Sequence, residues 1–281
     1  MQNQIISIQN EEGTTVEGTE EIAKVFVRYY SKILGTKTET LGIEDSIIKS
    51  GKILNLEQQM SLVRPFNSQQ VKEVLFSIPT NKSPGLDGYG SGFFKGQWNV
   101  GELVTKAVLD FFKEGQTLRQ VNATNLTLLP KVTDPKWPSE YRPIACCNTI
   151  YKVISKLISM RLREVLPDIV DLNQGAFVQE RELIHNILIC QEIAKGYNRK
   201  NFSARCMMKL DIQKAYESVD WKAIKGILHS LMFPDLFIKW VMFCISTPTY
   251  TLSINGGRYG YIKGAKGLRQ GTQYLHCYLC W

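Results

Sequence analysis

The sequence lacks a long apolar run, a disulfide pattern and a leader-type N-terminus, and each absence excludes a class of protein. No apolar stretch approaches the roughly 20 residues of a membrane-spanning helix, so no membrane partner is expected. The first residues have neither the basic nor the apolar segment of a signal peptide. The seven cysteines are odd in number and irregularly spaced, which predicts a reducing compartment, cytoplasmic or nuclear.

Acidic residues are also missing from one part of the chain. From Leu236 to the C-terminus there is no Asp or Glu, whereas the first 60 residues hold nine acids and six bases. The first 60 residues therefore carry −3 of the total net charge of +8, and the remainder carries +11. Such a basic remainder favours a polyanionic partner without identifying it. At 281 residues, the chain is long enough for one large domain or two ordinary ones.

Hydrophobic periodicity predicts a mixture of helices and strands. Apolar residues at helical spacing predict helices between Thr19 and Gly35, from Ser68 to Pro79, and over 103–112, 148–165 and 237–245. Thr19 is the expected N-cap of the first of these helices. Short strands are predicted over 125–131, 141–144, 250–257 and 259–262, paired as two hairpins. The helix over 148–165 is expected to point its basic residues outward, either to solvent or to a nucleic-acid backbone: Lys152, Lys156, Arg161 and Arg163.

The stretch from Cys206 to Trp221 carries the most chemical information. Its first residues predict a short buried strand that ends at Asp211, and one helix is expected from there to Met232. Taken alone, Asp211 would more often be a helix N-cap than a metal ligand.

Four sequence blocks together resemble reverse transcriptases of non-LTR (LINE-type) retrotransposons. The first palm motif of that family is similar to Lys209-Leu210-Asp211, Lys214-Ala215-Tyr216 and Val219-Asp220-Trp221. The second palm motif matches Lys266-Gly267-Leu268-Arg269-Gln270-Gly271. The opening of the fingers region resembles Lys82-Ser83-Pro84-Gly85-Leu86-Asp87-Gly88, and a further block resembles Gln174-Gly175-Ala176-Phe177-Val178. Glu217, Gly175, Glu180 and His185 depart from the commonest residues of the family.

This resemblance implies an α/β (α+β) fold with the fingers and part of the palm of a right-hand polymerase, a helical N-terminal lead and no thumb. The expected parts are an N-terminal helical connector over 1–65, a fingers region over 66–200 and a partial palm over 201–281. The resemblance also suggests a plant-type element that is truncated at its C-terminus.

The resemblance implies a role for each candidate site residue. Asp211 would be the catalytic carboxylate and would hold Mg²⁺ together with Ile212. Tyr216 would lie under the sugar of the incoming dNTP and screen for deoxyribose. Further roles implied by the resemblance are contacts with the nucleotide (Lys131, Arg142, Gln270 and Gly271) and with the RNA template or DNA primer (Arg269 and Gly267).

The hairpin itself supports one of these roles. It should bring Lys131 and Arg142 together, and two cations side by side repel each other unless an anion such as a triphosphate lies between them. Composition alone would favour a solvated hairpin without a ligand.

The sequence departs from the family after Gly271. The Asp-Pro-Leu-Ser-Pro continuation and the later Asp-Asp pair are missing, and residues 272–281 can be explained by a shifted reading frame. Two-metal phosphoryl transfer needs several carboxylates that clamp ions about 4 Å apart, which Asp211 alone cannot supply. Two hypotheses follow: an RNA-directed DNA polymerase that adds dNTP to a primer 3′ hydroxyl, or an inactive remnant that binds RNA or DNA non-specifically. The chain as given is expected to be inactive and poorly soluble, and no protein partner is predicted. A related intron maturase is disfavoured by the context of Tyr216.

Overall fold

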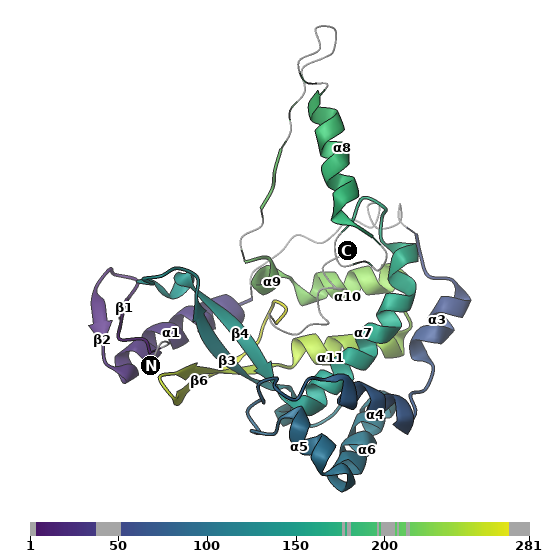
Figure 1. Cartoon of the computed structure of the whole chain (residues 1–281), viewed down its shortest axis with the longest axis horizontal. Helices are drawn as coiled ribbons and strands as arrows, with labels where there is room; N and C mark the ends of the chain where they lie inside the picture. The colour runs from purple at the N-terminus through teal and green to yellow at the C-terminus, as the bar shows by residue number, and fades with distance from the viewer. Residues whose placement is uncertain are drawn as a thin grey trace.

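The computed structural model describes residues 4–37, 52–175, 178, 181–195, 197, 206, 208–211 and 214–269. In this part of the chain, helices pack against a four-stranded sheet (Figure 1). The mixed helix-and-sheet fold expected from the sequence is therefore confirmed.

The elements follow one another in an irregular order of helices and strands. They are β1 (Ser7–Gln9), β2 (Thr15–Glu17), α1 (Thr19–Leu34), α3 (Leu56–Val63), α4 (Ser68–Ser77), α5 (Ser91–Gly96), α6 (Trp98–Glu114), the 3₁₀ turn η1 (Arg119–Asn122), β3 (Ala123–Pro130), the 3₁₀ turn η2 (Pro138–Glu140), β4 (Tyr141–Cys147), α7 (Thr149–Ile169), α8 (Leu183–Lys195), α9 (Ala215–Ser218), α10 (Trp221–Ser230), α11 (Asp235–Ser246), β5 (Thr249–Ile254) and β6 (Gly257–Lys263).

The main sheet has the strand order β4-β3-β5-β6. Strands β3 and β4 form one antiparallel hairpin and β5 and β6 form the other, so both predicted hairpins are confirmed. The hairpins are joined by parallel pairing of β3 with β5, in which Leu126 lies opposite Leu252. Alternate residues of β3 and β5 are buried, so one face of the sheet belongs to the core and the other is more open.

Helix α1 is part of the same core, because it packs against the β5–β6 hairpin (Figure 1). The ring of Phe26 on α1 also meets Tyr141 of β4 edge to face, with centroids 5.2 Å apart. At Gly260 of β6, φ is +72° and a Cβ atom would lie 2.8 Å from a methyl group of Val27. A glycine is needed at this close approach. The domain boundaries proposed from the sequence stay a prediction.

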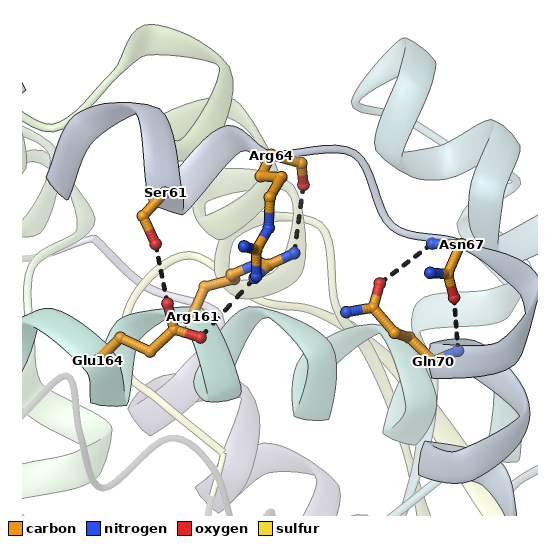
Figure 2. A network of polar contacts seen from close by, with 6 residues as sticks. All are labelled: Ser61, Arg64, Asn67, Gln70, Arg161 and Glu164. Atoms are coloured by element: carbon orange, nitrogen blue, oxygen red, sulfur yellow. Dashed lines mark hydrogen bonds and ion pairs between the residues drawn. The ribbon is translucent and has the colours of Figure 1, made fainter. Parts of the chain in front are cut away.

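Local capping decides where several helices begin. Gly18 is the N-cap residue of α1, so the expectation that Thr19 would fill that position was wrong. Helix α4 begins as predicted, because Asn67 and Gln70 form a reciprocal capping box (Figure 2). Helix α3 was not predicted, although Asn55 and Gln58 form the same box.

The predicted outward basic face of α7 needs a correction. Arg161 is only 3% exposed, its guanidinium lies 4.6 Å from the centroid of the Phe66 ring, and it donates to the carbonyl of Arg64 (Figure 2). The segment between α3 and α4 covers this side chain, and sequence periodicity could not place that segment. Lys152 and Lys156 donate to the carbonyl of Ser83 and the hydroxyl of Ser77, so they are also tied to neighbouring elements.

Helix α8 projects away from the other elements (Figure 1). Its large apolar side chains are about half exposed: Ile184, Ile187, Leu188, Ile189 and Ile193. No helix in the described ranges is both long and apolar enough to cross a bilayer.

Candidate functional site

The structure brings the two predicted palm motifs side by side. The backbone N–H groups of Gly267 and Leu268 donate to the carbonyls of Val219 at 2.8 Å and Tyr216 at 2.6 Å. The indole Nε1 of Trp221 donates to the carbonyl of Gly267 at 2.7 Å. Three hydrogen bonds therefore join the motif that contains Tyr216 to residues 266–269.

Gly267 is required by this junction for two reasons. Its φ of +83° lies in the left-handed region, where residues other than glycine are strained. A Cβ atom on Gly267 would also lie 2.8 Å from the backbone oxygen of Glu217. The second palm motif can thus approach α9 this closely only through a glycine.

The first palm motif contains two helices where one was predicted. Helix α9 ends at Ser218, and α10 begins at Trp221 with Asp220 as its N-cap residue. The Asp220 carboxylate accepts from the backbone N–H of Lys222 at 2.5 Å and of Ala223 at 3.4 Å. In a continuous helix, these two N–H groups would donate to carbonyls of the preceding turn. The Asp220 carboxylate accepts from them instead, so a new helix begins here.

The surroundings of Asp211 also differ from the prediction. Met208 and Leu210 are 74% and 80% exposed, and the described residues from Met208 to Asp211 form no strand. The prediction of a buried strand was wrong for these residues. A strand forms where a neighbour binds its backbone, and the edge strands β4 and β6 of the described sheet do not pair with this segment.

The described residues do not complete a magnesium site. Asp211 is exposed, and the described ranges contain no group of three or more His, Cys, Asp or Glu side chains placed to share a metal ion. Ile212, the second expected ligand, lies outside the described residues. Asp211 therefore offers one carboxylate, whereas protein-bound magnesium in a two-metal site needs several oxygen ligands.

The β3–β4 hairpin places Lys131 and Arg142 on the same side of the ladder. Arg142 lies opposite Leu129, and the backbone N–H of Lys131 donates to the carbonyl of Glu140, which continues the pairing beyond Pro130. Both side chains are exposed, and Lys131 Nζ donates to the carbonyl of Ser139 at 2.7 Å. The hairpin is confirmed, and its contact with phosphate stays a prediction.

The turn of this hairpin is held by Glu140. Its carboxylate accepts from the backbone N–H of Lys136 at 2.6 Å and of Trp137 at 3.0 Å. The hydrogen bond from the backbone of Trp137, followed in size by the one from Lys136, lowers the pKa of Glu140. The charged carboxylate that holds the turn is therefore favoured.

The remaining site residues fall in three different environments. Tyr216 is half-buried against the core. The guanidinium of Arg269, for which the resemblance implies a contact with template or primer, lies inside the core and is 5% exposed. Gln270 and Gly271 lie outside the described residues.

A basic cleft of about 730 Å³, which the sequence did not predict, lies between α1 and the tip of the β3–β4 hairpin. Its lining includes three bases of α1, two aromatic rings and a lysine of the first palm motif: Lys24, Arg28, Lys32, Tyr29, Trp137 and Lys214. Nζ of Lys214 lies 5.1 Å from the centroid of the Tyr29 ring. The signal available in the sequence was the recurrence of a base at every fourth position of α1, opposite the apolar stripe.

Acidic side chains balance part of this charge. Glu11 lies 3.5 Å from Lys32 and 3.8 Å from Arg28, and Glu21 lies 2.6 Å from Lys24. All of these groups are exposed by about half or more, so each pair is worth little and can exchange its partner for another anion.

Comparison with known proteins agrees with the motifs. The transposon TX1 uncharacterized 149 kDa protein of Xenopus laevis is 25% identical over 269 residues, which cover 95% of this chain and 20% of that protein. The retrovirus-related Pol polyprotein from type-2 retrotransposable element R2DM of Drosophila melanogaster is 20% identical, over 79% of this chain and 20% of its own length. The probable RNA-directed DNA polymerase from transposon BS, also of Drosophila melanogaster, is 25% identical, over 57% of this chain and 18% of its own length.

The chain thus spans about a fifth of the length of these curated relatives. Residues 129–274, more than half of the chain, match the family described as reverse transcriptase (RNA-dependent DNA polymerase). The matched segment begins in β3 and includes both palm motifs. The family match and the retrotransposon relatives confirm the resemblance to non-LTR retrotransposon proteins, and the chain belongs to the reverse transcriptase (RNA-dependent DNA polymerase) family.

Proposed function

We propose that this chain binds the RNA template, the DNA primer and the incoming dNTP of an RNA-directed DNA polymerase. The observation that carries the proposal is the junction of the two palm motifs, in which Gly267 and Leu268 bind the backbone beside Tyr216. Segments that are about 50 residues apart in the chain are thereby joined, and the resemblance to the family implies that both of them contact the substrates.

The nucleotide would be held from two sides. Tyr216 would lie under its sugar, while Lys131 and Arg142 would contact the triphosphate, Arg142 through a fork of N–H groups and Lys131 as a point charge. Gln270 and Gly271 would contact the nucleotide, and Gly267 would lie beside the template. The exposure of Lys131 and Arg142 on one side of the hairpin supports this assignment.

The basic cleft would receive the nucleic-acid backbone. Arg28 and Lys32 of α1 and Lys214 of the first palm motif supply positive charge, and Trp137 supplies an aromatic face. Phosphates attract such groups without regard to sequence, and bases stack on aromatic rings. Template and primer are found in the cytoplasm or nucleus, the location expected from the cysteines.

A second candidate function, binding without polymerisation, is favoured by the single carboxylate of Asp211. Magnesium would be held by Asp211 and Ile212 only together with further acidic ligands, which the described residues do not supply. We therefore propose that the chain as given binds its substrates but does not extend a primer.

A salt titration of RNA binding tests the first proposal. Filter binding of single-stranded RNA should weaken as salt rises, and Arg28→Ala together with Lys32→Ala should reduce the log–log slope by about 0.7 for each lost phosphate contact. Lys113→Ala, at an exposed position of α6, is the matched control and should leave the slope unchanged. Affinity that does not depend on salt would contradict backbone binding.

Primer extension distinguishes an active polymerase from a chain that only binds its substrates. The purified chain is incubated with an RNA template, a DNA primer, dNTPs and magnesium, in parallel with Asp211→Asn. We expect no extended product from either protein. Magnesium-dependent products that disappear in Asp211→Asn would show that the chain is an active polymerase.

A further inference from the structure

The side chain of Arg269 connects elements that are far apart in the sequence. Nη1 donates to the Thr124 hydroxyl of β3 at 2.8 Å and to Sγ of Cys147 in β4 at 3.6 Å. Nη2 donates to the Asn122 side-chain oxygen and to the carbonyl of Cys244 in α11 at 2.8 Å. With an exposed fraction of 5%, the guanidinium is an internal hydrogen-bonding centre and not a surface group.

An aromatic ring completes the surroundings of this charge. The guanidinium carbon lies 3.9 Å from the centroid of the Tyr151 ring on α7. The face of an aromatic ring attracts a cation, and the attraction is stronger when both are removed from water. Such a site favours arginine over lysine, because the planar guanidinium can stack on a ring while its edge donates several hydrogen bonds.

The backbone next to Arg269 makes the contacts that join the palm motifs. Leu268 is 3% exposed and its N–H donates to the carbonyl of Tyr216, while Gly267 bonds to Val219 and Trp221. The side chain of one residue thus binds the sheet and α11, and the two residues before it bind α9 and the start of α10. A shift of Arg269 would be passed directly to Tyr216 through Leu268.

We propose that Arg269 is a positioning residue, whose buried guanidinium fixes residues 266–269 so that their backbone holds Tyr216 and Trp221 in place. Arg269 then acts on the nucleotide site through the protein core and not by touching template or primer. The assignment of Tyr216 to the nucleotide rests on the proposed function, whereas the anchoring of Trp221 by Arg269 does not.

Arg161 provides a matched control, because it is a second buried arginine in a different part of the molecule. It is 3% exposed, lies over the ring of Phe66 and donates to the carbonyl of Arg64, and it lies 3.7 Å from the Glu164 carboxylate (Figure 2). These contacts join α7 to the segment between α3 and α4. Loss of either arginine should destabilise the protein, but only loss of Arg269 should release the palm junction.

Two indole groups report the difference. Trp221 Nε1 donates to Gly267 in the palm junction, whereas Trp240 Nε1 donates to the carbonyl of Phe112 at 3.1 Å and reports the core around α6 and α11. Hydrogen exchange of both N–H groups is followed by NMR in tryptophan-labelled protein, and Trp221→Phe identifies the Trp221 signal. In Arg269→Met, exchange at Trp221 should accelerate at least roughly tenfold more than exchange at Trp240.

Arg161→Met should speed exchange at Trp240 at least as much as at Trp221, because Arg161 stacks on Phe66, which packs against Phe112 and Trp240. Arg269→Lys should behave like Arg269→Met, since an ammonium cannot stack and fork in the same way. If Arg269→Met does not fold, Thr124→Val removes one acceptor at similar shape and should shift exchange at Trp221 in the same direction. Equal changes at both indoles in the Arg269 variants, or normal protection of Trp221 in Arg269→Lys, would overturn the proposal. Failure of the unsubstituted chain to bind RNA would overturn the proposed function alone, because the exchange experiment contains no nucleic acid.

Discussion

The side-chain amide of Asn255 pairs with the backbone of Ile5 through two hydrogen bonds. Oδ1 accepts from the N–H of Ile5 at 2.9 Å, and Nδ2 donates to its carbonyl at 2.8 Å. Asn255 lies in the turn between β5 and β6 with a φ of +48°. The turn of the last hairpin thus holds the first described residues of the chain.

Replacement of Asn255 by glycine should lower the free energy of unfolding by about 1–2 kcal/mol, the value of one or two partly buried hydrogen bonds. Glycine accepts a positive φ, so the loss would report the amide and not the backbone. Urea unfolding measures the change. The same replacement at the exposed Asn81 is the control, and equal losses in both variants would contradict a contribution from the pair with Ile5.

Gly267→Ala should destabilise the protein by about 2 kcal/mol or more, because the left-handed backbone is strained by a side chain and the Cβ atom would press on Glu217. Gly226→Ala is the matched control. Gly226 lies inside α10 with nothing within 4 Å of its missing Cβ, so alanine there should stabilise by about 1 kcal/mol. Thermal or urea unfolding distinguishes the two signs. A neutral Gly267→Ala would mean that the palm junction can be repacked.

Stability should fall as the pH rises above about 9. Burial raises the pKa of the Cys244 thiol and of the Tyr250 hydroxyl, each to about 12. In the unfolded chain these groups lose their protons near pH 9 and 10, so between those values and about 12 the unfolded state binds fewer protons than the folded state. The stabilisation is complete below the unfolded pKa values and is lost as the pH approaches the folded ones.

Tyr250→Phe tests this dependence on a single group. In this variant, the free energy of unfolding should fall less steeply with pH. The slope near pH 11 should be smaller by about 1.4 kcal/mol per pH unit, because one titrating proton is removed. Urea unfolding from pH 7 to pH 11 gives the slope. Tyr261→Phe, at a residue that is 77% exposed, should leave the slope unchanged. Identical slopes in the wild type and Tyr250→Phe would contradict the prediction.

The apolar surface of α8 should bind the dye ANS and lower solubility, because large exposed apolar patches promote association. Ile187 and Ile189 are 52% and 55% exposed, so replacing both with glutamine should reduce dye fluorescence without lowering the unfolding midpoint. Leu157→Gln, at a fully buried position of α7, should instead lower the midpoint strongly. If the α8 variant binds as much dye as the unsubstituted chain, the surface that binds ANS does not lie on α8, and the prediction is contradicted.

Helices and hairpins could be predicted where their signals are local. The apolar stripe and Gly35 define α1, Pro79 follows the end of α4, and the glycine-rich turn after Asn255 marks the last hairpin. The placement of Lys131 and Arg142 on the same side of one hairpin was predictable for the same reason, since it depends only on the pairing of neighbouring strands.

Other features depend on partners that no local pattern reveals. Arginine is expected at the surface by default, yet Arg269 is buried among acceptors from distant segments, and Arg161 is buried under the Phe66 ring and the carbonyl of Arg64. The restart of the helix at Asp220 reflects competition between a carboxylate and the backbone for the same N–H groups. The strand expected before Asp211 has no partner in the described sheet, and a strand cannot be stable without one.

The parallel pairing of β3 with β5 has a consequence for the order in which the chain can fold during synthesis. The β3–β4 hairpin can form soon after it is synthesised. Thr124 of β3, however, can pair with Tyr250 only after β5 has been synthesised. Helix α1 can meet Tyr141 of β4 once the first hairpin is made, but its contacts with β5 and β6 form only after those strands are made. The part of α1 that packs on β5 and β6 therefore stays uncovered while the segment between the two hairpins is made, and the yield in a cell should depend on the chaperones that shield such apolar surfaces.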